Sequence, residues 1–221
     1  AEQLDNLYIF KNTEGTPENI RKFHPNIIVS STGSAPLLPP IAGLKDRIDN
    51  EKHNIYSILG MISHINDFPK DLEGKKVVVV GGGAVGLDVV EFFADRNADI
   101  YIVEMMDQIG RDLDPVSKND TKTMMKKHNV HQLTKTALLE VKDSSFLVRG
   151  DGEPYELPFE YGFVCLGMRA QGQLYQNLTE EFSSEDVEIM NIGDSQRARR
   201  IIDGTQEGRN ILTILEQKGY L

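Results

Sequence analysis

The stretch "VVVVGGGAVGLDVV", residues 77–90, determines the fold. Its run of β-branched residues predicts a buried strand, its glycines a tight turn, and its last residues the start of an amphipathic helix. The segment "DIYIVE", residues 99–104, then predicts a second strand. A strand, a glycine turn, a helix and a second strand in this order form a βαβ unit, which is typical of dinucleotide-binding proteins.

Gly81, Gly83 and Gly86 fit the spacing G-x-G-x-x-G. The first glycine allows the tight turn, the second lets a pyrophosphate approach the backbone, and the third lets the helix pack close to the strand. Ala84 and Val85 stand between the last two glycines, where the helix N-terminus offers free N–H groups to phosphates. We predict that these five residues bind NADH. The alternative is a tight strand–helix turn without a ligand.

Glu104 ends the second strand, 21 residues after Gly83. A carboxylate there can accept hydrogen bonds from the adenosine ribose and would repel a 2′-phosphate. Because Met105 and Met106 are not basic, the sequence favours NADH over NADPH. A surface acid without a ligand is the other interpretation of Glu104.

Alternating strands and helices along the chain predict an α/β fold with a Rossmann-like parallel sheet. Further strands are expected within residues 26–33 and 187–194, where each runs into a glycine turn, and at residues 7–10 and 161–167. Short β segments are expected between residues 130 and 160, and helices at residues 54–68 and 198–219. The last helix carries its apolar side chains mostly on one stripe. Residues 34–44 contain prolines and are expected to be an irregular crossing segment.

The composition limits the range of functions. A net charge of −10 argues against binding nucleic acid through its phosphates. No apolar run approaches the roughly 20 residues of a membrane span, no secretory signal is visible at the start, and we expect a cytoplasmic protein.

Cys165 is the only cysteine, so the chain has no internal disulfide or CxxC pair; its apolar surroundings predict a buried thiol. The histidines lack metal-ligand spacing, and no metal site or catalytic residue is predicted.

Three flanking segments carry a resemblance. "NIIVSSTGSAPLLPPIAGL" (26–44), "VCLGMRAQ" (164–171) and "MNIGDSQRARRIIDGTQEGRNI" (190–211) resemble segments of flavoprotein reductases in which an NAD(P)H domain is inserted into an FAD domain. The last segment resembles the C-terminal region of the NADH:flavin oxidoreductases related to old yellow enzyme. That family includes 2-enoate reductase, 2,4-dienoyl-CoA reductase and trimethylamine dehydrogenase.

The resemblance implies an organisation and a set of sites. Residues 51–167 would form the NAD(P)H-binding domain, and residues 1–50 and 168–221 an incomplete FAD-binding domain. Gly167 would lie near the nicotinamide, whereas Thr32, Gly33, Gly193 and Asp194 would contact FAD. The family's N-terminal barrel with FMN, its 4Fe–4S cluster and the glycine fingerprint of its FAD domain have no counterpart here. The chain is therefore expected to be a fragment, which puts FAD binding by this chain alone in doubt.

Three functions stay open at this point. The first is an NADH:flavin oxidoreductase part that passes hydride from NADH to FAD, with electrons continuing in the whole protein to the iron–sulfur centre, FMN and an unsaturated substrate. The second is a relative of the pyridine nucleotide-disulfide reductases, which would need redox cysteines outside this sequence. The third is a non-catalytic NAD(H)-binding module. Besides NADH, the partner implied is the barrel domain of the same protein; a homo-oligomer also stays open.

Overall fold

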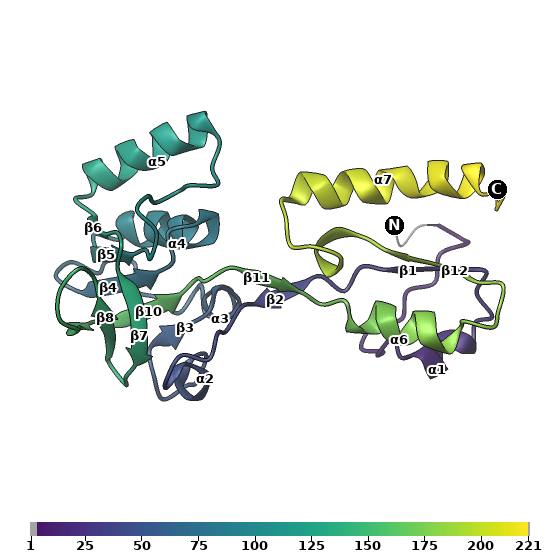
Figure 1. Cartoon of the computed structure of the whole chain (residues 1–221), viewed down its shortest axis with the longest axis horizontal. Helices are drawn as coiled ribbons and strands as arrows, with labels where there is room; N and C mark the ends of the chain where they lie inside the picture. Colours follow the sequence, from purple (N-terminus) through teal and green to yellow (C-terminus); the bar gives the residue numbers. More distant parts are fainter. Residues whose placement is uncertain (1–3, 221) are drawn as a thin grey trace. The chain divides into compact units, whose positions relative to one another are not determined.

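The chain divides into two compact units in the computed structural model, which describes residues 4–220 (Figure 1). Unit 1 comprises residues 1–35 and 169–221, and unit 2 comprises residues 36–168. The chain passes between the units twice, and the two crossing segments pair with each other as strands β2 (Ser34–Pro36) and β11 (Met168–Ala170). Residues 34–36 are therefore regular structure, contrary to our expectation, and the proline at the strand's end costs β2 one backbone donor.

Unit 2 begins earlier than the domain boundary drawn from the sequence. Residues 36–50 belong to it, and helix α2 (Leu44–Arg47) is their regular part. Leu44 is completely buried, and together with Ile48 it packs in one cluster with Val141 and Phe146. Burial of these two apolar side chains fixes the segment to unit 2. The nucleotide that each unit binds stays a prediction.

A five-stranded parallel sheet forms the centre of unit 2, as the sequence predicted. Its strand order is β3-β10-β4-β5-β6. The strands are β3 (Ile55–Tyr56), β10 (Tyr161–Val164), β4 (Lys76–Val80), β5 (Asp99–Val103) and β6 (His131–Leu133). The valine run of β4 lies at the middle of this sheet and is buried on both faces, which explains its continuous apolar sequence.

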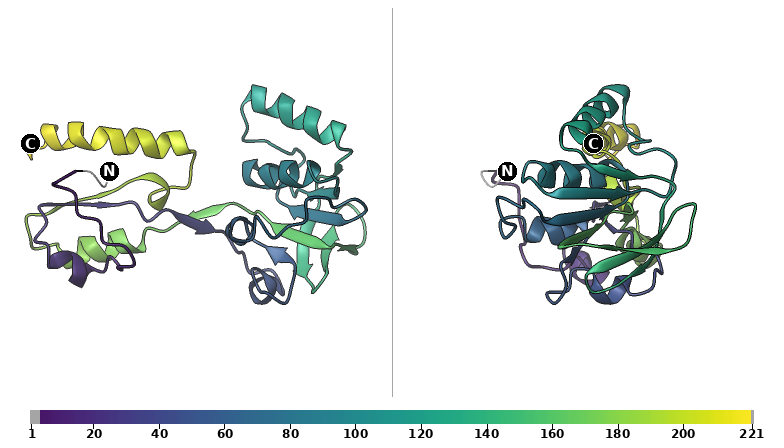
Figure 2. Two further views of the ribbon diagram at one scale, coloured as in Figure 1. Left: turned by 180° about the vertical axis from the view of Figure 1, so that it is seen from behind. Right: turned by 90° about the vertical axis from the view of Figure 1, so that its left-hand side faces the viewer.

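Two layers cover the sheet of unit 2. Val77 and Val79 pack in the core cluster that includes helix α4 (Ala84–Ala94), with α5 (Pro115–Lys127) on the same side (Figure 2). Val78 and Val80 pack in the opposite cluster, because successive side chains of a strand alternate between faces. That second layer holds α2 and the antiparallel sheet β7-β8-β9, made of β7 (Ala137–Val141), β8 (Ser145–Arg149) and β9 (Tyr155–Pro158).

The helix expected at residues 54–68 is shorter than the sequence indicated. Ile55 is fully buried and pairs with Gly162 of β10, so the segment begins as strand β3. Ser57 then caps helix α3 (Ile58–Ser63), because its hydroxyl accepts the Gly60 N–H at 3.1 Å. Strand pairing at one end and the cap beside it therefore leave α3 only six residues.

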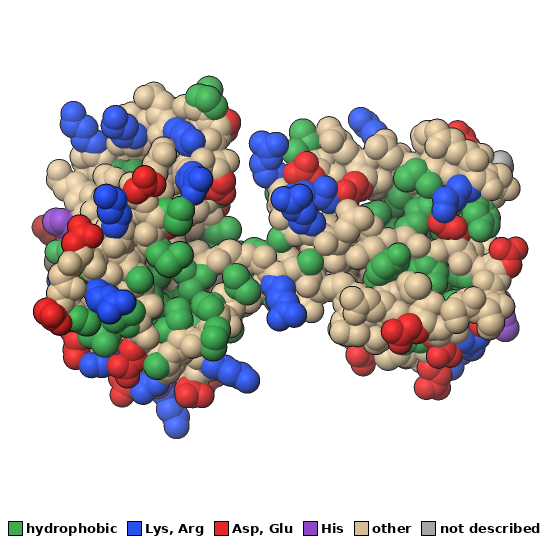
Figure 3. Space-filling model, viewed as in Figure 1, with side chains coloured by type: hydrophobic (Ala, Val, Ile, Leu, Met, Phe, Trp, Pro, Cys, Tyr) green, Lys and Arg blue, Asp and Glu red, His purple; other side chains and the backbone are tan. Residues whose placement is uncertain are grey.

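Unit 1 contains a two-stranded parallel sheet of β1 (Ile27–Ser30) and β12 (Glu188–Asn191). Its other elements are α1 (Pro17–Arg21), α6 (Gln173–Glu181), the 3₁₀ turn η1 (Gly193–Ser195) and α7 (Ile201–Gln217). The core is small: Ile28, Leu178 and Phe182 form its buried cluster. Hydrophobic side chains are visible on the surface of this unit in Figure 3.

One expectation for unit 1 is corrected. Residues 7–10 form no strand, and all four side chains are exposed, because no neighbouring strand pairs with them among residues 4–220. The apolar stripe of α7 is only partly buried: Leu215 is buried, whereas 92% of Ile201 and 62% of Leu212 remain exposed. Within the described part of the chain, no helix has the length and apolar character needed to cross a membrane.

Candidate functional site

The turn after β4 has the geometry that the first glycine permits. Gly81 has a φ of +108°, which L-residues with side chains rarely adopt. A Cβ at this position would lie 2.1 Å from the carbonyl oxygen of Cys165. The Gly81 N–H donates to the Val103 carbonyl at 2.8 Å. The turn is thus fixed between the ends of β10 and β5, and a side chain has no room there.

The other two glycines of the fingerprint differ in their surroundings. A Cβ on Gly86 would lie 1.9 Å from the Gly81 carbonyl oxygen, so α4 packs directly against the turn. Gly83, the N-cap residue of α4, has nothing within 4 Å of a Cβ position. Ala84 and Val85 begin the helix behind it, where the first amides have no intrahelical acceptor. Open space at Gly83 and free amides behind it suit a phosphate.

Glu104 lies directly beside the glycine turn. Its Oε2 accepts the Gly82 N–H at 2.6 Å, and its Oε1 accepts the Met106 N–H at 2.7 Å. The backbone of Glu104 extends the sheet: its N–H donates to Leu133, and its carbonyl accepts the Thr136 N–H, both at 2.9 Å. The carboxylate is half-buried and fixed, and each oxygen retains a lone pair for another donor.

A cleft of about 840 Å³ opens at this end of the sheet of unit 2. Five of the residues predicted to bind NADH line it: Gly81, Gly83, Val85, Glu104 and Gly167. Ala84 and Gly86 lie in the first turn of α4 without lining the cleft. Three segments that the sequence prediction of binding residues did not include also contribute to its wall: residues 37–41, residues 105–112 and residues 136–138.

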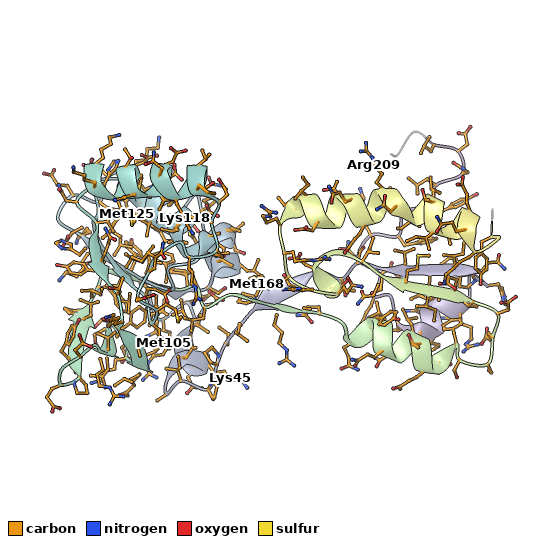
Figure 4. The ribbon with its side chains drawn as sticks, turned by 45° about the horizontal axis from the view of Figure 1, so that its top comes forward. Lys45, Met105, Lys118, Met125, Met168 and Arg209 are labelled. Carbon is orange, nitrogen blue, oxygen red and sulfur yellow. The ribbon has the colours of Figure 1, made fainter. Side chains whose placement is uncertain are left out.

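The cleft is mainly apolar with a few charges at one side. Leu37, Ile41 and Leu138 line it, together with Met105, which is labelled in Figure 4. Arg111 is the only basic residue among the described residues of the cleft wall. The structure gives its guanidinium no hydrogen bond or ion pair. An apolar cleft with a few placed polar groups is the usual form of a cofactor site.

The loop that carries Arg111 is attached to the glycine turn. The Gly110 N–H donates to the Gly82 carbonyl at 2.7 Å, and Lys118 of α5, labelled in Figure 4, donates to the Arg111 carbonyl at 3.0 Å. Parallel strands end at the same edge of a sheet, so the loops after β4, β5 and β10 meet there. That rule could have identified residues 105–112 as part of the site; residues 37–41 carry no comparable signal.

Cys165 is a buried thiol, as the sequence predicted, although one edge of it reaches the cleft wall. Burial raises its pKa to about 12, and the nearby Asp88 carboxylate adds to the shift. Asp88 itself has a raised pKa, mainly because the neighbouring protein partly desolvates its carboxylate and also because Glu91 lies nearby. A thiol with this pKa is protonated at neutral pH and is not a nucleophile.

The residues that the resemblance assigned to FAD all lie in unit 1. Ser34 Oγ donates to Asp194 Oδ2 at 3.0 Å, and the Arg199 N–H donates to Asp194 Oδ1 at 3.1 Å. The Gly193 N–H donates at 2.6 Å to Glu207, which also pairs with Arg199. The Arg199 guanidinium and the Gly193 amide lower the pKa of Glu207. One remaining lone pair on each Asp194 oxygen is available to a ligand hydroxyl, whereas the Gly193 amide is already occupied.

Thr32 and Gly33 stand between β1 and β2. Thr32 Oγ1 donates to the Gln171 carbonyl at 2.6 Å, and the Gly33 carbonyl accepts the Gln171 N–H at 2.9 Å. Gly33 has a φ of +76° and open space around a Cβ position. Contacts of these two residues with a flavin stay a prediction.

The chain is similar in sequence and in fold to several known proteins. The metal reductase of Desulforamulus reducens is 26% identical over 90% of this chain and 32% of its own length. The NADH oxidase of Thermoanaerobacter brockii is 26% identical over 86% of this chain and 28% of its own length. A solved 2-naphthoyl-CoA reductase complex superposes with a TM-score of 0.73 at 22% identity, over 89% of this chain and 28% of its own.

The chain thus spans about a third of the length of the relatives it matches. The solved structure shows that the chain has the Rossmann-like α/β fold of that reductase. The family model described as pyridine nucleotide-disulphide oxidoreductase matches residues 8–190, which include the whole of unit 2. The chain belongs to the pyridine nucleotide-disulphide oxidoreductase family.

Proposed function

We propose that the chain is the pyridine-nucleotide-binding part of a flavin-dependent oxidoreductase and that unit 2 binds NADH. The observation that carries this proposal is the cleft in which Gly83, the N-terminus of α4 and Glu104 meet. The free amides at the start of α4 would hold the pyrophosphate, and the open space at Gly83 would let it approach the backbone. When bound, NADH supplies a hydride; the protein binds and orients it.

Glu104 supports NADH over NADPH, because its carboxylate in the cleft wall would repel a 2′-phosphate. Arg111 in the same wall favours the opposite choice, since an unpaired guanidinium can bind a phosphate. We give more weight to Glu104, because two backbone amides fix its charge at the glycine turn.

The electron acceptor that we propose is FAD, contacted by Asp194 of unit 1 through its free lone pairs. FMN and a 4Fe–4S cluster would be held by a barrel domain outside this sequence. This chain itself has one cysteine, which is too few to ligate a cluster. The final substrate would be an unsaturated compound of the enoate reductase class. In support, the chain resembles 2-naphthoyl-CoA reductase, whose name carries an aromatic acyl group.

A dithiol-based reaction is the second candidate, because the family's name includes disulphide oxidoreductases. Cys165 does not serve it, since its thiol is buried and its pKa is about 12. A redox cysteine pair would have to lie outside this sequence. A non-catalytic NAD(H)-binding module would use the same cleft without any flavin.

Fluorescence titration with NADH and NADPH tests the proposal. We expect the chain to bind NADH more tightly than NADPH and Gly83→Asp to abolish binding of both, because a carboxylate would fill the space of the pyrophosphate. Gly152→Asp is the matched control: its Cβ also meets nothing within 4 Å, and it lies in the β8–β9 turn, outside the cleft wall. Equal NADH binding by wild type and Gly83→Asp would refute the site.

A further inference from the structure

The carboxylate of Glu104 joins two segments of the cleft through backbone amides. The Gly82 N–H belongs to the glycine turn, and the Met106 N–H belongs to the loop after β5. We call Glu104 with these two amides the Glu104 clasp. Both hydrogen bonds have a charged acceptor and are short, which places them among the stronger hydrogen bonds of proteins.

Gly82 is fixed from both sides. Its N–H is taken by Glu104, while its carbonyl accepts the Gly110 N–H at 2.7 Å. A Cβ on Gly82 would lie 3.0 Å from Glu104 Oε2 and 3.1 Å from Ile109 Cγ1, so this residue of the turn is closely packed. Gly82 is also buried, so loss of Glu104 would leave its amide without a protein acceptor in the present conformation.

Gly83 follows directly after Gly82 and begins the open part of the turn. The direction of the free amides at the start of α4 therefore depends on a peptide that Glu104 holds. Both hydrogen bonds of the clasp are made between groups of the protein, so the clasp preorganises the phosphate site without requiring a ligand contact.

We propose that Glu104 is a positioning residue for the pyrophosphate turn, in addition to any contact with the adenosine ribose. The proposal rests on the proposed binding of NADH in this cleft. It implies that Glu104 contributes to the binding of diphosphates that have no ribose hydroxyl. A residue that contacts only the ribose contributes nothing to such ligands.

The test compares ADP with 2′,3′-dideoxy-ADP, each displacing NADH in a fluorescence competition assay. Glu104→Ala is expected to weaken dideoxy-ADP by a factor of about ten, because the turn loses a hydrogen bond with a charged acceptor, and to weaken ADP by at least as much, because any ribose contact is lost as well. Glu104→Gln keeps one acceptor oxygen and should rescue part of this loss for both ligands. Asp112→Asn is the matched control: it removes a negative charge from the same cleft wall without breaking the clasp.

Weaker binding of ADP with unchanged binding of dideoxy-ADP in Glu104→Ala would reduce Glu104 to a ribose contact and overturn the proposal. Unchanged binding of both ligands would also overturn it. Hydrogen exchange of the Gly82 amide in the ligand-free chain adds a readout independent of binding: Glu104→Ala should speed it, and Asp112→Asn should not. If the wild type fails to bind NADH, the proposed function is refuted but the clasp is not. The rate of hydrogen exchange at the Gly82 amide in Glu104→Ala then tests whether Glu104 holds the turn.

Discussion

At the scale of single residues, two glycines of one fingerprint have opposite physical roles. Gly86→Val places side-chain atoms against the Gly81 carbonyl oxygen, which lies 1.9 Å from the Cβ position, and neither backbone segment can move freely. We expect a loss of about 2–3 kcal/mol in the free energy of unfolding, as for an overpacked core. Gly83→Val, with open space around it, should leave stability nearly unchanged but prevent NADH binding.

Urea unfolding of both variants beside the wild type measures the difference between the two glycines. Equal destabilisation by the two valines would contradict the distinction between a packing glycine and a ligand-facing glycine. The sequence could assign both roles in advance, because they follow from the order of strand, turn and helix. It could not show that Gly82, the residue before Gly83, is held by Glu104, since that contact joins residues 22 positions apart through a side chain.

At the scale of elements, helix α5 depends on the charge of its N-cap residue. Asp114 caps the helix: its Oδ1 accepts the amides of Val116 and Ser117, and its Oδ2 accepts the Ser117 hydroxyl at 2.6 Å. These bonds lower the pKa of Asp114 from its ordinary 3.8, the Ser117 hydroxyl most of all. A lowered pKa in the folded state means stability that is present above pH 3.8 and lost as the pH falls through the folded value.

Asp114→Ala should therefore be less stable than the wild type at pH 6, and the difference should shrink as the pH falls to about 3. Chemical unfolding at several pH values measures it. Asp114→Asn is the control, because asparagine caps helices about as well but does not titrate there. A difference between wild type and Asp114→Ala that stays constant with pH would show that the charge of Asp114 does not support α5.

Elements also show where sequence patterns stop being informative. The strands β4 and β5 and the helix α4 follow from local patterns: β4 is a continuous run of β-branched residues, and the apolar residues of α4 and β5 are the ones that the structure buries. Residues 7–10 have an equally apolar pattern but remain irregular, because a strand also needs a neighbour. The contribution of residues 37–41 to the cleft depends on the packing of Leu44, which no local pattern encodes.

At the scale of the whole molecule, the two units differ in the size of their cores. Unit 2 contains buried clusters of 17 and 12 hydrophobic residues, whereas the buried cluster found in the described part of unit 1 has three. Hydrophobic burial is the main stabilising term, so unit 1 should unfold at the lower temperature. We therefore expect two calorimetric transitions from one chain, in place of a single two-state transition.

Ligands should separate these transitions. NADH at one hundred times its dissociation constant stabilises the state that binds it by about 2.7 kcal/mol, so it should raise the upper transition and leave the lower one in place. FAD, if Asp194 and its neighbours bind it, should raise the lower one. Gly83→Asp should remove the NADH shift while keeping both transitions. A shift of the lower transition by NADH would mean that unit 1 depends on the occupied cleft, contrary to a site contained in unit 2.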